Sequence, residues 1–311
     1  PGVDWPPISA VIAHDAQIAA AGITTVFDAL RVGTFDPGDL AARDSEKLLS
    51  AITQAQLMQH LRAEHFIHLR CELPCPDTLE SAVSTIQSGD IHLISLMDHT
   101  PGARQFTSLD KFRQYYLGKK LILPEKIDDY IEERRALQVI YATTNKVGLL
   151  QMARARNIPM LSHDDATAAH VDEAVADGVV IAEFPTTAES AAAARNHGLK
   201  ILMGAPNLIR GGSHSGNIST EEVARAGHLD MMSSDYVPMS LLLAAFELPN
   251  RIETISLPQA VATISKNPAQ IAGLNDRGEI AVGLRADLAR VSMATGFPVV
   301  KQLWRQGQRV L

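Results

Sequence analysis

The sequence predicts an α/β fold with a parallel sheet that helices cover. Short apolar, β-branched runs alternate with longer Ala-rich stretches of helical character, and several of these stretches end in Gly, the usual residue just past a helix. The apolar runs are continuous rather than alternating, which indicates strands buried on both faces. Because seven such units follow one another, we expect a (β/α)8 TIM barrel whose missing strand belongs before Pro1.

Seven candidate strands can be read in order along the chain. They cover residues 22–29, 65–73, 91–98, 158–163, 178–185, 199–206 and 229–235. A doubly wound open sheet is the alternative fold, but no Gly-rich phosphate loop follows the first candidate strand. The length of 311 residues suits one large barrel with a small appendage.

Two segments do not follow this alternation of strands and helices. Residues 103–150 are polar, helical in pattern and too long for a simple crossover. We expect them to form a helical insertion over the carboxyl-end face of the barrel, where loops carry function. From 275 to 311, short alternating runs between Gly, Asp and Pro predict a separate small sheet. The predicted organisation is a barrel over 1–274 and part of a small β-sandwich over 275–311.

Composition and charge exclude several classes of protein. The net charge of -7 argues against a nucleic-acid binder that works through bulk electrostatics. The chain has no apolar run of about 18 residues and no signal-peptide pattern, so we expect a cytoplasmic protein without a membrane partner. Cys71 and Cys75 lack the spacing of a redox pair and the further soft ligands of a zinc site, and we interpret them as reduced thiols. Assembly into a homo-oligomer is left open.

Ionisable side chains stand where the predicted strands end. His68, Arg70 and Glu72 alternate along one strand and therefore share a face, either as a functional group or as a buried ion-pair network. The other residues at strand ends are Asp98, His99, His163, Asp164, Asp165, Glu183 and Asp235. Helix capping explains any one of them but not the whole series. Imidazole and carboxylate are the natural ligands of Zn²⁺ and Mn²⁺, so we predict a divalent metal site, with Zn²⁺ expected and Mn²⁺ the alternative.

A Gly-rich segment at 204–217 follows the sixth candidate strand. Its glycines allow backbone N–H groups to approach an anion, and its arginine and histidine supply charge-assisted hydrogen bonds. The alternatives are a flexible surface loop and a P-loop, but the latter lacks its Gly-Lys-Ser/Thr. We predict a phosphate-handling loop, and we expect the substrate to contact Arg70, Asp164, Arg210, Ser213, His214 and Asn217.

Several motifs resemble those of the amidohydrolase superfamily. "GEIAVGLRADLARV" resembles the closing sheet that flanks a metal-dependent (β/α)8 barrel in this superfamily, and "AGITTVFDAL" resembles its second barrel strand. Within the superfamily, the chain is similar to the diphosphatases that act in phosphonate degradation by the carbon–phosphorus lyase pathway. The motifs that carry this narrower resemblance are "HLRCEL", "LMDHTPGARQF", "LSHDDAT", "EFPTTAESA", "MGAPNLIRGGSHSGN" and "SSDYVPMSLL". Together they span nearly the whole chain.

The resemblance implies a metal-dependent hydrolase that cleaves a phosphoanhydride. Its substrate would be a phosphorylated ribose phosphonate, a 5-triphosphate, converted into the 5-phosphate and diphosphate. An amide or cyclic-amide hydrolase on the same barrel is the alternative, because a fold does not fix a function.

The resemblance also implies roles for individual residues. Glu72, His99 and His163 are the implied metal ligands, and Asp235 is both a ligand and the general base. The first-strand His-x-His or His-x-Asp pair of the superfamily is absent from this chain. Many members have a histidine at the position of Glu183, so whether Glu183 binds metal is left open. We expect Asp165 to cap the helix that follows it.

Overall fold

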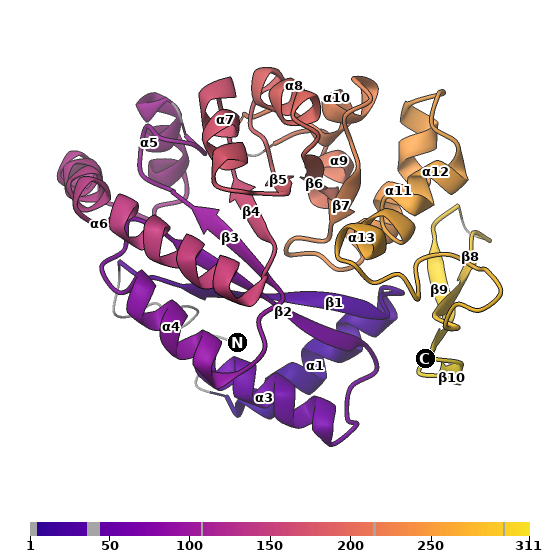
Figure 1. The fold of residues 1–311 in the computed structure, drawn as a ribbon. Coiled ribbons are helices and arrows are strands. Elements are labelled where there is room, and N and C mark those ends of the chain that lie inside the picture. Colours follow the sequence, from indigo (N-terminus) through magenta and orange to yellow (C-terminus); the bar gives the residue numbers. More distant parts are fainter. Residues whose placement is uncertain (1–4, 36–43, 107, 214–215, 295) are drawn as a thin grey trace.

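A seven-stranded parallel sheet forms the centre of the computed structural model, which describes residues 5–35, 44–106, 108–213, 216–294 and 296–311 (Figure 1). The strands are β1 (Thr25–Val32), β2 (Glu64–Glu72), β3 (Leu93–Met97), β4 (Met160–His163), β5 (Ile181–Glu183), β6 (Lys200–Gly204) and β7 (Met231–Ser233). All seven predicted strands are present in the predicted order, with bounds shifted by a few residues.

The sheet curves as a half-barrel. Its strand order follows the sequence from β1 to β7, and within the described residues no pairing joins β7 back to β1. A doubly wound sheet would instead reverse its strand order at a switch point. The α/β barrel class is therefore confirmed, with seven strands where a complete (β/α)8 barrel has eight.

Helices lie around the outside of the curved sheet (Figure 1). They are α1 (Pro7–Ala20), α3 (Ser45–Leu57), α4 (Thr78–Ser88), α5 (Leu109–Gly118), α6 (Ile127–Arg156), α7 (Ala168–Ala176), α8 (Ala188–Asn196), α9 (Ala205–Arg210), α10 (Thr220–Arg225), α11 (Ser240–Arg251), α12 (Leu257–Ala262) and α13 (Lys266–Ile271), with the 3₁₀ helix η1 (Pro124–Lys126). Among the described helices, none combines the length and the apolar character that a membrane crossing requires.

The alternation of side chains along each strand separates two faces of the sheet. Ile67 and Leu69 of β2 belong to the main core, together with Leu49 of α3 and Leu149 of α6. The concave face has its own apolar cluster, formed by Leu93, Leu161, Ile181 and Met231. Because successive residues of a strand point to opposite faces, the even-numbered residues of β2 line the concave side. The polar trio His68, Arg70 and Glu72 therefore faces the interior of the half-barrel.

The polar segment between β3 and β4 is helical. It contains α5, η1 and α6, and α6 alone has 30 residues. Phe106 and Phe112 pack with Ile127 and Ile131 in a cluster that holds α5 against the start of α6. Whether this segment acts as a cover over the carboxyl-end face stays a prediction.

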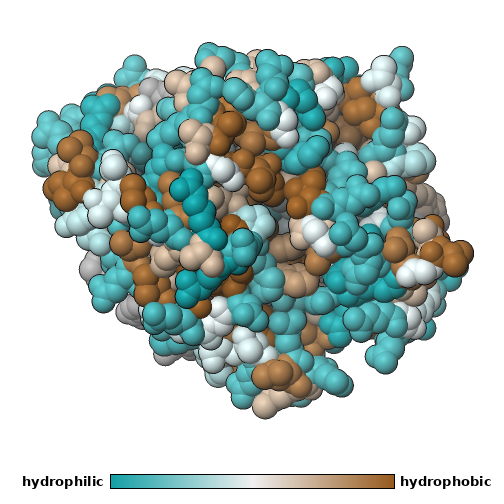
Figure 2. All heavy atoms as spheres, viewed as in Figure 1, coloured by the Kyte–Doolittle hydropathy of each residue, from teal (hydrophilic) through white to brown (hydrophobic). Residues whose placement is uncertain are grey.

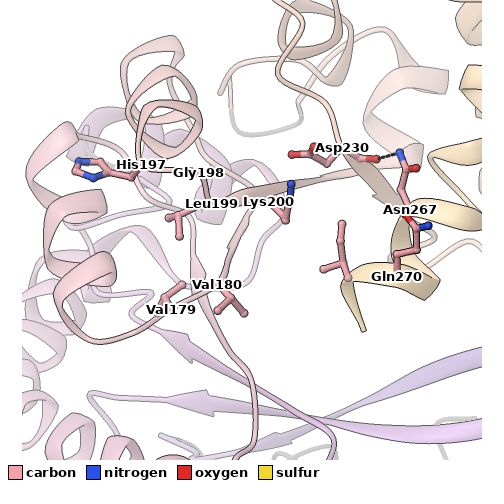
Figure 3. Close-up of a pocket in the computed structure, with 10 residues that line it drawn as sticks. Val179, Val180, His197, Gly198, Leu199, Lys200, Asp230, Asn267 and Gln270 are labelled. Carbon is pink, nitrogen blue, oxygen red and sulfur yellow. Dashed lines mark hydrogen bonds between the residues drawn. The ribbon is translucent and has the colours of Figure 1, made fainter. Parts of the chain in front are cut away.

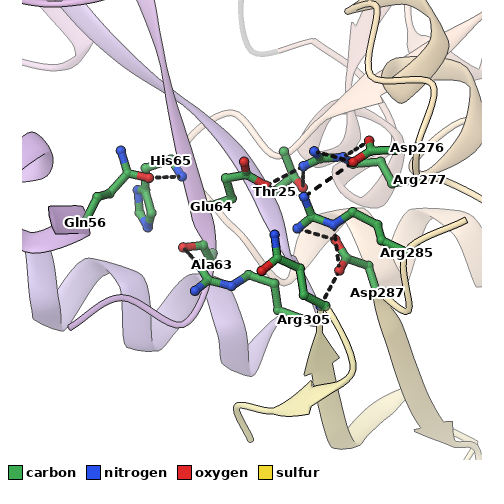
Figure 4. Close-up of polar contacts among 11 residues, drawn as sticks. Thr25, Gln56, Ala63, Glu64, His65, Asp276, Arg277, Arg285, Asp287 and Arg305 are labelled. Atoms are coloured by element: carbon green, nitrogen blue, oxygen red, sulfur yellow. Dashed lines mark hydrogen bonds and ion pairs between the residues drawn. The ribbon is translucent and has the colours of Figure 1, made fainter. Parts of the chain in front are cut away.

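A three-stranded antiparallel sheet ends the chain. It consists of β8 (Leu288–Ser292), β9 (Val299–Arg305) and β10 (Gln308–Arg309), in the order β10-β9-β8. Arg277 and Arg285 both contact the Glu64 carboxylate at the start of β2, each at 2.6 Å, and Arg305 donates to the Ala63 carbonyl (Figure 4). These contacts attach β9 and the segment before β8 to the amino-terminal end of β2. The division of the chain at 274 stays a prediction.

A buried histidine ties α1 to the first two strands. His65 Nδ1 donates to Asp28 Oδ2 at 2.6 Å, and His65 Nε2 donates to Asp15 Oδ1 at 3.3 Å. Burial disfavours the imidazolium, but the hydrogen bonds and charges of the two carboxylates outweigh it and raise the pKa of His65 to about 9. His65 is therefore a cation held between two carboxylates at neutral pH.

This cluster makes stability depend on pH. Because the pKa of His65 is higher in the folded protein, its contribution is complete below the ordinary value of 6.5 and is lost as pH rises through about 9. We expect the free energy of unfolding of the wild type to fall between about pH 6 and pH 10 by on the order of 3 kcal/mol more than that of His65→Gln.

Urea unfolding across this pH range measures the difference. His60→Gln, which changes an exposed histidine, is the control and should follow the wild type. Parallel pH curves for the wild type and His65→Gln would contradict the assignment.

Candidate metal centre

Three side chains converge at the carboxyl ends of β3 and β4. They are His99, His163 and Asp164, and one potential ligand atom of each lies within 4.8 Å of the others. Asp164 Oδ2 is 3.5 Å from His163 Nε2 and 3.8 Å from His99 Nε2. The two imidazole rings meet edge to face, with 5.4 Å between their centres. His163 and Asp164 are buried, whereas His99 is partly exposed.

Each of the two histidines forms a hydrogen bond through Nδ1 with a glutamate carboxylate. His99 Nδ1 donates to Glu72 Oε2 at 2.5 Å, and the backbone N–H of His99 donates to Glu72 Oε1 at 2.9 Å. His163 Nδ1 donates to Glu183 Oε2 at 2.7 Å. When a metal ion takes the place of the Nε2 proton, an imidazole that donates from Nδ1 presents its Nε2 lone pair. The Nε2 atoms of both histidines are directed to the cluster, as in metal sites where a carboxylate orients a ligand histidine.

The hydrogen bonds continue inward from Glu183. Ser95 Oγ donates to Glu183 Oε2 at 2.7 Å and accepts from His68 Nε2 at 2.5 Å. Burial lowers the pKa of His68 to about 4, so this histidine is neutral at physiological pH. A single chain of buried polar groups therefore joins β2, β3, β4 and β5 beneath the cluster.

Both glutamates are held in the ionised form. Burial on its own would raise their pKa values, but the nearby histidines outweigh it. The charge and hydrogen bonds of His99 lower the pKa of Glu72 to about 2, and His163 holds the pKa of Glu183 far below its usual range. Because an ionised carboxylate only accepts hydrogen bonds, each glutamate constrains its histidine to donate from Nδ1.

The cluster fits a divalent cation. Asp164 Oδ2 is buried and has no hydrogen-bond partner among the described residues, and the Nε2 atoms of His99 and His163 face it. A buried carboxylate oxygen without a donor is costly, and a cation removes that cost. Two ligands of one tetrahedral Zn²⁺ at about 2.1 Å lie roughly 3.4 Å apart, close to the 3.5 and 3.8 Å that separate Asp164 Oδ2 from the two Nε2 atoms. Imidazole nitrogen and carboxylate oxygen are also the donor types that Zn²⁺ and Mn²⁺ accept.

Left-handed backbone conformations gather at the same edge of the sheet. Asp164 has φ 56°, Phe184 has φ 57° and Asp235 has φ 48°, and they follow β4, β5 and β7. The turn lets the Asp164 N–H donate to the Glu183 carbonyl at 2.9 Å, and the Phe184 N–H donate to the Leu202 carbonyl at 2.9 Å. Non-glycine residues adopt this conformation at a cost, and such strain is commonly found at functional sites.

Comparison with known proteins assigns the chain to a family. A profile described as "Amidohydrolase family" matches residues 134–310. The α-D-ribose 1-methylphosphonate 5-triphosphate diphosphatase of Escherichia coli (strain K12) is 47% identical over 311 residues, which are 100% of this chain and 82% of that protein. The chain belongs to the amidohydrolase family.

Two solved structures share the fold of this amidohydrolase. One is an uncharacterized protein with a TM-score of 0.58 and 18% identity, over 98% of this chain and 80% of that chain. The other is an adenosine deaminase from Xanthomonas campestris with bound zinc, with a TM-score of 0.52 and 12% identity, over 100% of this chain and 71% of that chain. At these identities the likeness concerns the fold alone.

The structure brings some of the expected ligands together and separates others. His99 and His163 meet, as the sequence predicted, but Glu72 lies behind His99 with both of its oxygens engaged. Asp164, predicted as a substrate contact, stands in the cluster itself. Asp235 follows β7 at the carboxyl edge and is exposed, outside the cluster that the described residues form. The individual roles of these residues stay predictions.

Arg70 and Arg210, two of the predicted substrate contacts, lie towards the same edge of the sheet of this amidohydrolase. Arg70 Nη2 donates to His163 Nε2 at 3.3 Å, so its guanidinium lies directly beside the cluster. Arg210 ends α9, which forms the first part of the predicted loop, and its Nη1 donates to the Tyr236 hydroxyl at 3.1 Å. Asn217 donates to the Gln105 carbonyl at 3.4 Å. Ser213 is partly buried, and His214 lies outside the described residues.

The expectation that Asp165 caps the following helix was wrong. Thr167, not Asp165, caps α7, because its hydroxyl accepts from the His170 N–H. The Asp165 carboxylate instead pairs with Arg104 from the segment after β3.

Ser95 lies within an apolar strand, and only its contacts with His68 and Glu183 identify it as part of the site.

A separate cavity of about 640 Å³ opens at the other end of the sheet (Figure 3). Val180 precedes β5, Lys200 begins β6, and Gln270 of α13 closes the opposite side. Because the strands are parallel, this cavity and the His–Asp cluster lie at opposite edges of the sheet. It is distinct from the candidate metal centre.

Removing the negative charge behind a histidine should weaken metal binding. We expect Glu183→Gln to reduce the affinity for Zn²⁺ by about 10–100-fold, because the tautomer and orientation of His163 are then less strongly fixed. Competition with a chromogenic chelator measures the affinity of each variant. Glu80→Gln, on the exposed side of α4, is the control. An unchanged affinity in Glu183→Gln would show that the carboxylate does not orient a ligand.

Proposed function

We propose that this amidohydrolase is a metal-dependent diphosphatase that converts α-D-ribose 1-methylphosphonate 5-triphosphate into the 5-phosphate and diphosphate. The observation that carries the proposal is the 47% identity with the Escherichia coli enzyme of that name, over the full length of this chain. The His–His–Asp cluster supports it, because hydrolysis of a polyanionic phosphoanhydride benefits from a divalent cation.

His99, His163 and Asp164 would hold the cation, with Zn²⁺ as the proposed ion and Mn²⁺ as the alternative. A bound divalent ion neutralises charge on phosphoryl oxygens and lowers the pKa of a coordinated water towards neutrality. Glu72 and Glu183 act as positioning residues, because each fixes the proton of one ligand histidine on Nδ1.

Asp235 is the proposed general base. It follows β7 at the same carboxyl edge as the cluster, in a left-handed turn that fixes the local course of the backbone. Its carboxylate would take the proton from the attacking water as the water oxygen bonds to phosphorus. The anhydride P–O bond then breaks, and diphosphate leaves with the bonding electron pair.

Cationic and polar side chains would bind the phosphates and the phosphonate. The chain as a whole carries a net charge of -7, so a polyanionic substrate requires local positive charge. Arg70 supplies it beside His163, and Arg210 supplies it near Asp235 through its contact with Tyr236. The hydroxyl of Ser213, the His214 imidazole and the Asn217 amide are the remaining proposed contacts.

Phosphorus NMR of the reaction products tests the proposed function. We expect purified protein to release diphosphate from ribose 1-methylphosphonate 5-triphosphate, and we expect a chelator to stop the reaction until Zn²⁺ or Mn²⁺ is restored. Failure to release diphosphate with metal present would overturn the proposal. Hydrolysis of cyclic amides instead would favour the amide-hydrolase alternative.

Loss of the proposed base should abolish most of the turnover. We expect Asp235→Asn to lower kcat by more than about a hundredfold, the usual scale for a general base, while elemental analysis still finds bound metal. Asp90→Asn changes an exposed carboxylate just before β3, at the opposite end of the sheet, and should keep wild-type turnover. Near-native turnover in Asp235→Asn would exclude this residue as the base.

A further inference from the structure

The middle of α6 contains an unusual run of uncharged residues, and several of them are exposed to solvent. Residues 136–145 read "ALQVIYATTN", without a single Lys, Arg, Asp or Glu. Val139 is 84% exposed, Ile140 61% and Val147 47%. Single exposed apolar residues are common on protein surfaces, but several on one helix mark an interaction site.

Ile140 and Val147 belong to one stripe along the outer side of α6, and Val139 lies at its flank. At 3.6 residues per turn the stripe consists of Asp129, Glu133, Ala136, Ile140, Thr143, Val147, Gln151 and Arg154, and all of them are exposed. The opposite side of the helix, with Ile131, Leu149 and Ala153, is buried. The α6 stripe therefore faces away from the protein over about 37 Å of helix.

The figures agree with this placement. Figure 1 shows α6 along the left of the molecule, outside the sheet, and Figure 2 shows hydrophobic side chains on the same side of the surface. Lys146, at one flank of the stripe, pairs with Glu173 and Asp177, each at 2.5 Å, and so helps to hold α6 against α7. The surface that the stripe presents thus belongs to a helix fixed on the barrel.

The two ends of the α6 stripe carry opposite charges. Asp129 and Glu133 lie at its amino-terminal end, and Arg154 lies at its carboxyl-terminal end. Arg154 Nη2 donates to the Asp177 carbonyl at 2.9 Å, which keeps the guanidinium at the surface near the helix. A stripe that is acidic at one end, apolar in the middle and basic at the other is complementary to itself when reversed.

We propose that the α6 stripe binds a second copy of this chain, with the two α6 helices antiparallel about a twofold axis. In the register that places Asp129 opposite Arg154 of the second copy, Ile140 lies opposite Thr143 near the axis. The same register sets Ala136 opposite Val147 of the second copy. A parallel arrangement would bring like charges together and is disfavoured.

The shape of the stripe suits close helix packing. Its central side chains are small or β-branched, so the two helix axes can approach to about 8–10 Å. A crossing angle near 20° keeps long helices in contact over most of their length, which leaves the charged ends within reach of one another. A twofold contact uses the same surface on both copies, so assembly stops at the dimer.

Sedimentation velocity of the full chain tests the apolar centre of this contact. Over about 1–100 µM we expect the wild type to form a dimer of the 33.6 kDa chain. Ile140→Glu places two like charges near the twofold axis and should raise the dimer Kd by more than about tenfold. Leu57→Glu, which changes an 80% exposed side chain at the end of α3, is the matched control and should leave the dimer intact.

Charge reversal tests the orientation of the two helices. Asp129→Arg and Arg154→Asp should each weaken the dimer, and the double variant should restore it, because every reversed charge again meets its opposite. Circular dichroism melts establish that each variant is folded. A monomeric wild type, which would leave the stripe to a different partner, overturns the proposal. So does a dimer insensitive to Ile140→Glu, or a double variant as weak as the single ones.

Discussion

The hydrogen bonds from His99 to Glu72 and from His163 to Glu183 are the interactions on which the candidate metal centre depends. Both carboxylates are buried, and the imidazole that lies against each of them lowers its pKa. In return, each carboxylate fixes the proton of its histidine on Nδ1 and directs the Nε2 lone pair to Asp164. Without these bonds the cluster would consist of buried polar groups with no fixed orientation.

The parallel sheet is what brings these groups together. His163 and Glu183 are register partners on adjacent strands, so their side chains share the concave face. The chain of bonds through Ser95 to His68 then reaches across two further strands, and the left-handed turn at Asp164 aims its carboxylate back at both histidines. The outer helices serve a different role: their apolar sides bury the convex face, which leaves the solvent side of α6 free for a partner.

Much of the fold followed from local sequence patterns. Continuous apolar runs identified all seven strands, because a strand covered on both faces has no polar alternation. The residues at strand ends identified His99 and His163, because the carboxyl ends of parallel strands meet at one edge. The same reasoning could not distinguish a ligand from the group that supports it. Glu72 and Asp164 look alike in sequence, and Asp165 looked like a helix cap although it pairs with Arg104.

The sequence by itself determined the barrel architecture, the family and the edge at which chemistry is expected, since these depend on periodicity and on motifs within short segments. Only the tertiary structure decided which acidic groups enter the cluster and which lie behind a histidine. Ser95 is the clearest example, because nothing in its own strand marks it as functional. The reason is physical: a hydrogen bond depends on distances between atoms of separate strands, and a linear pattern contains no such distances.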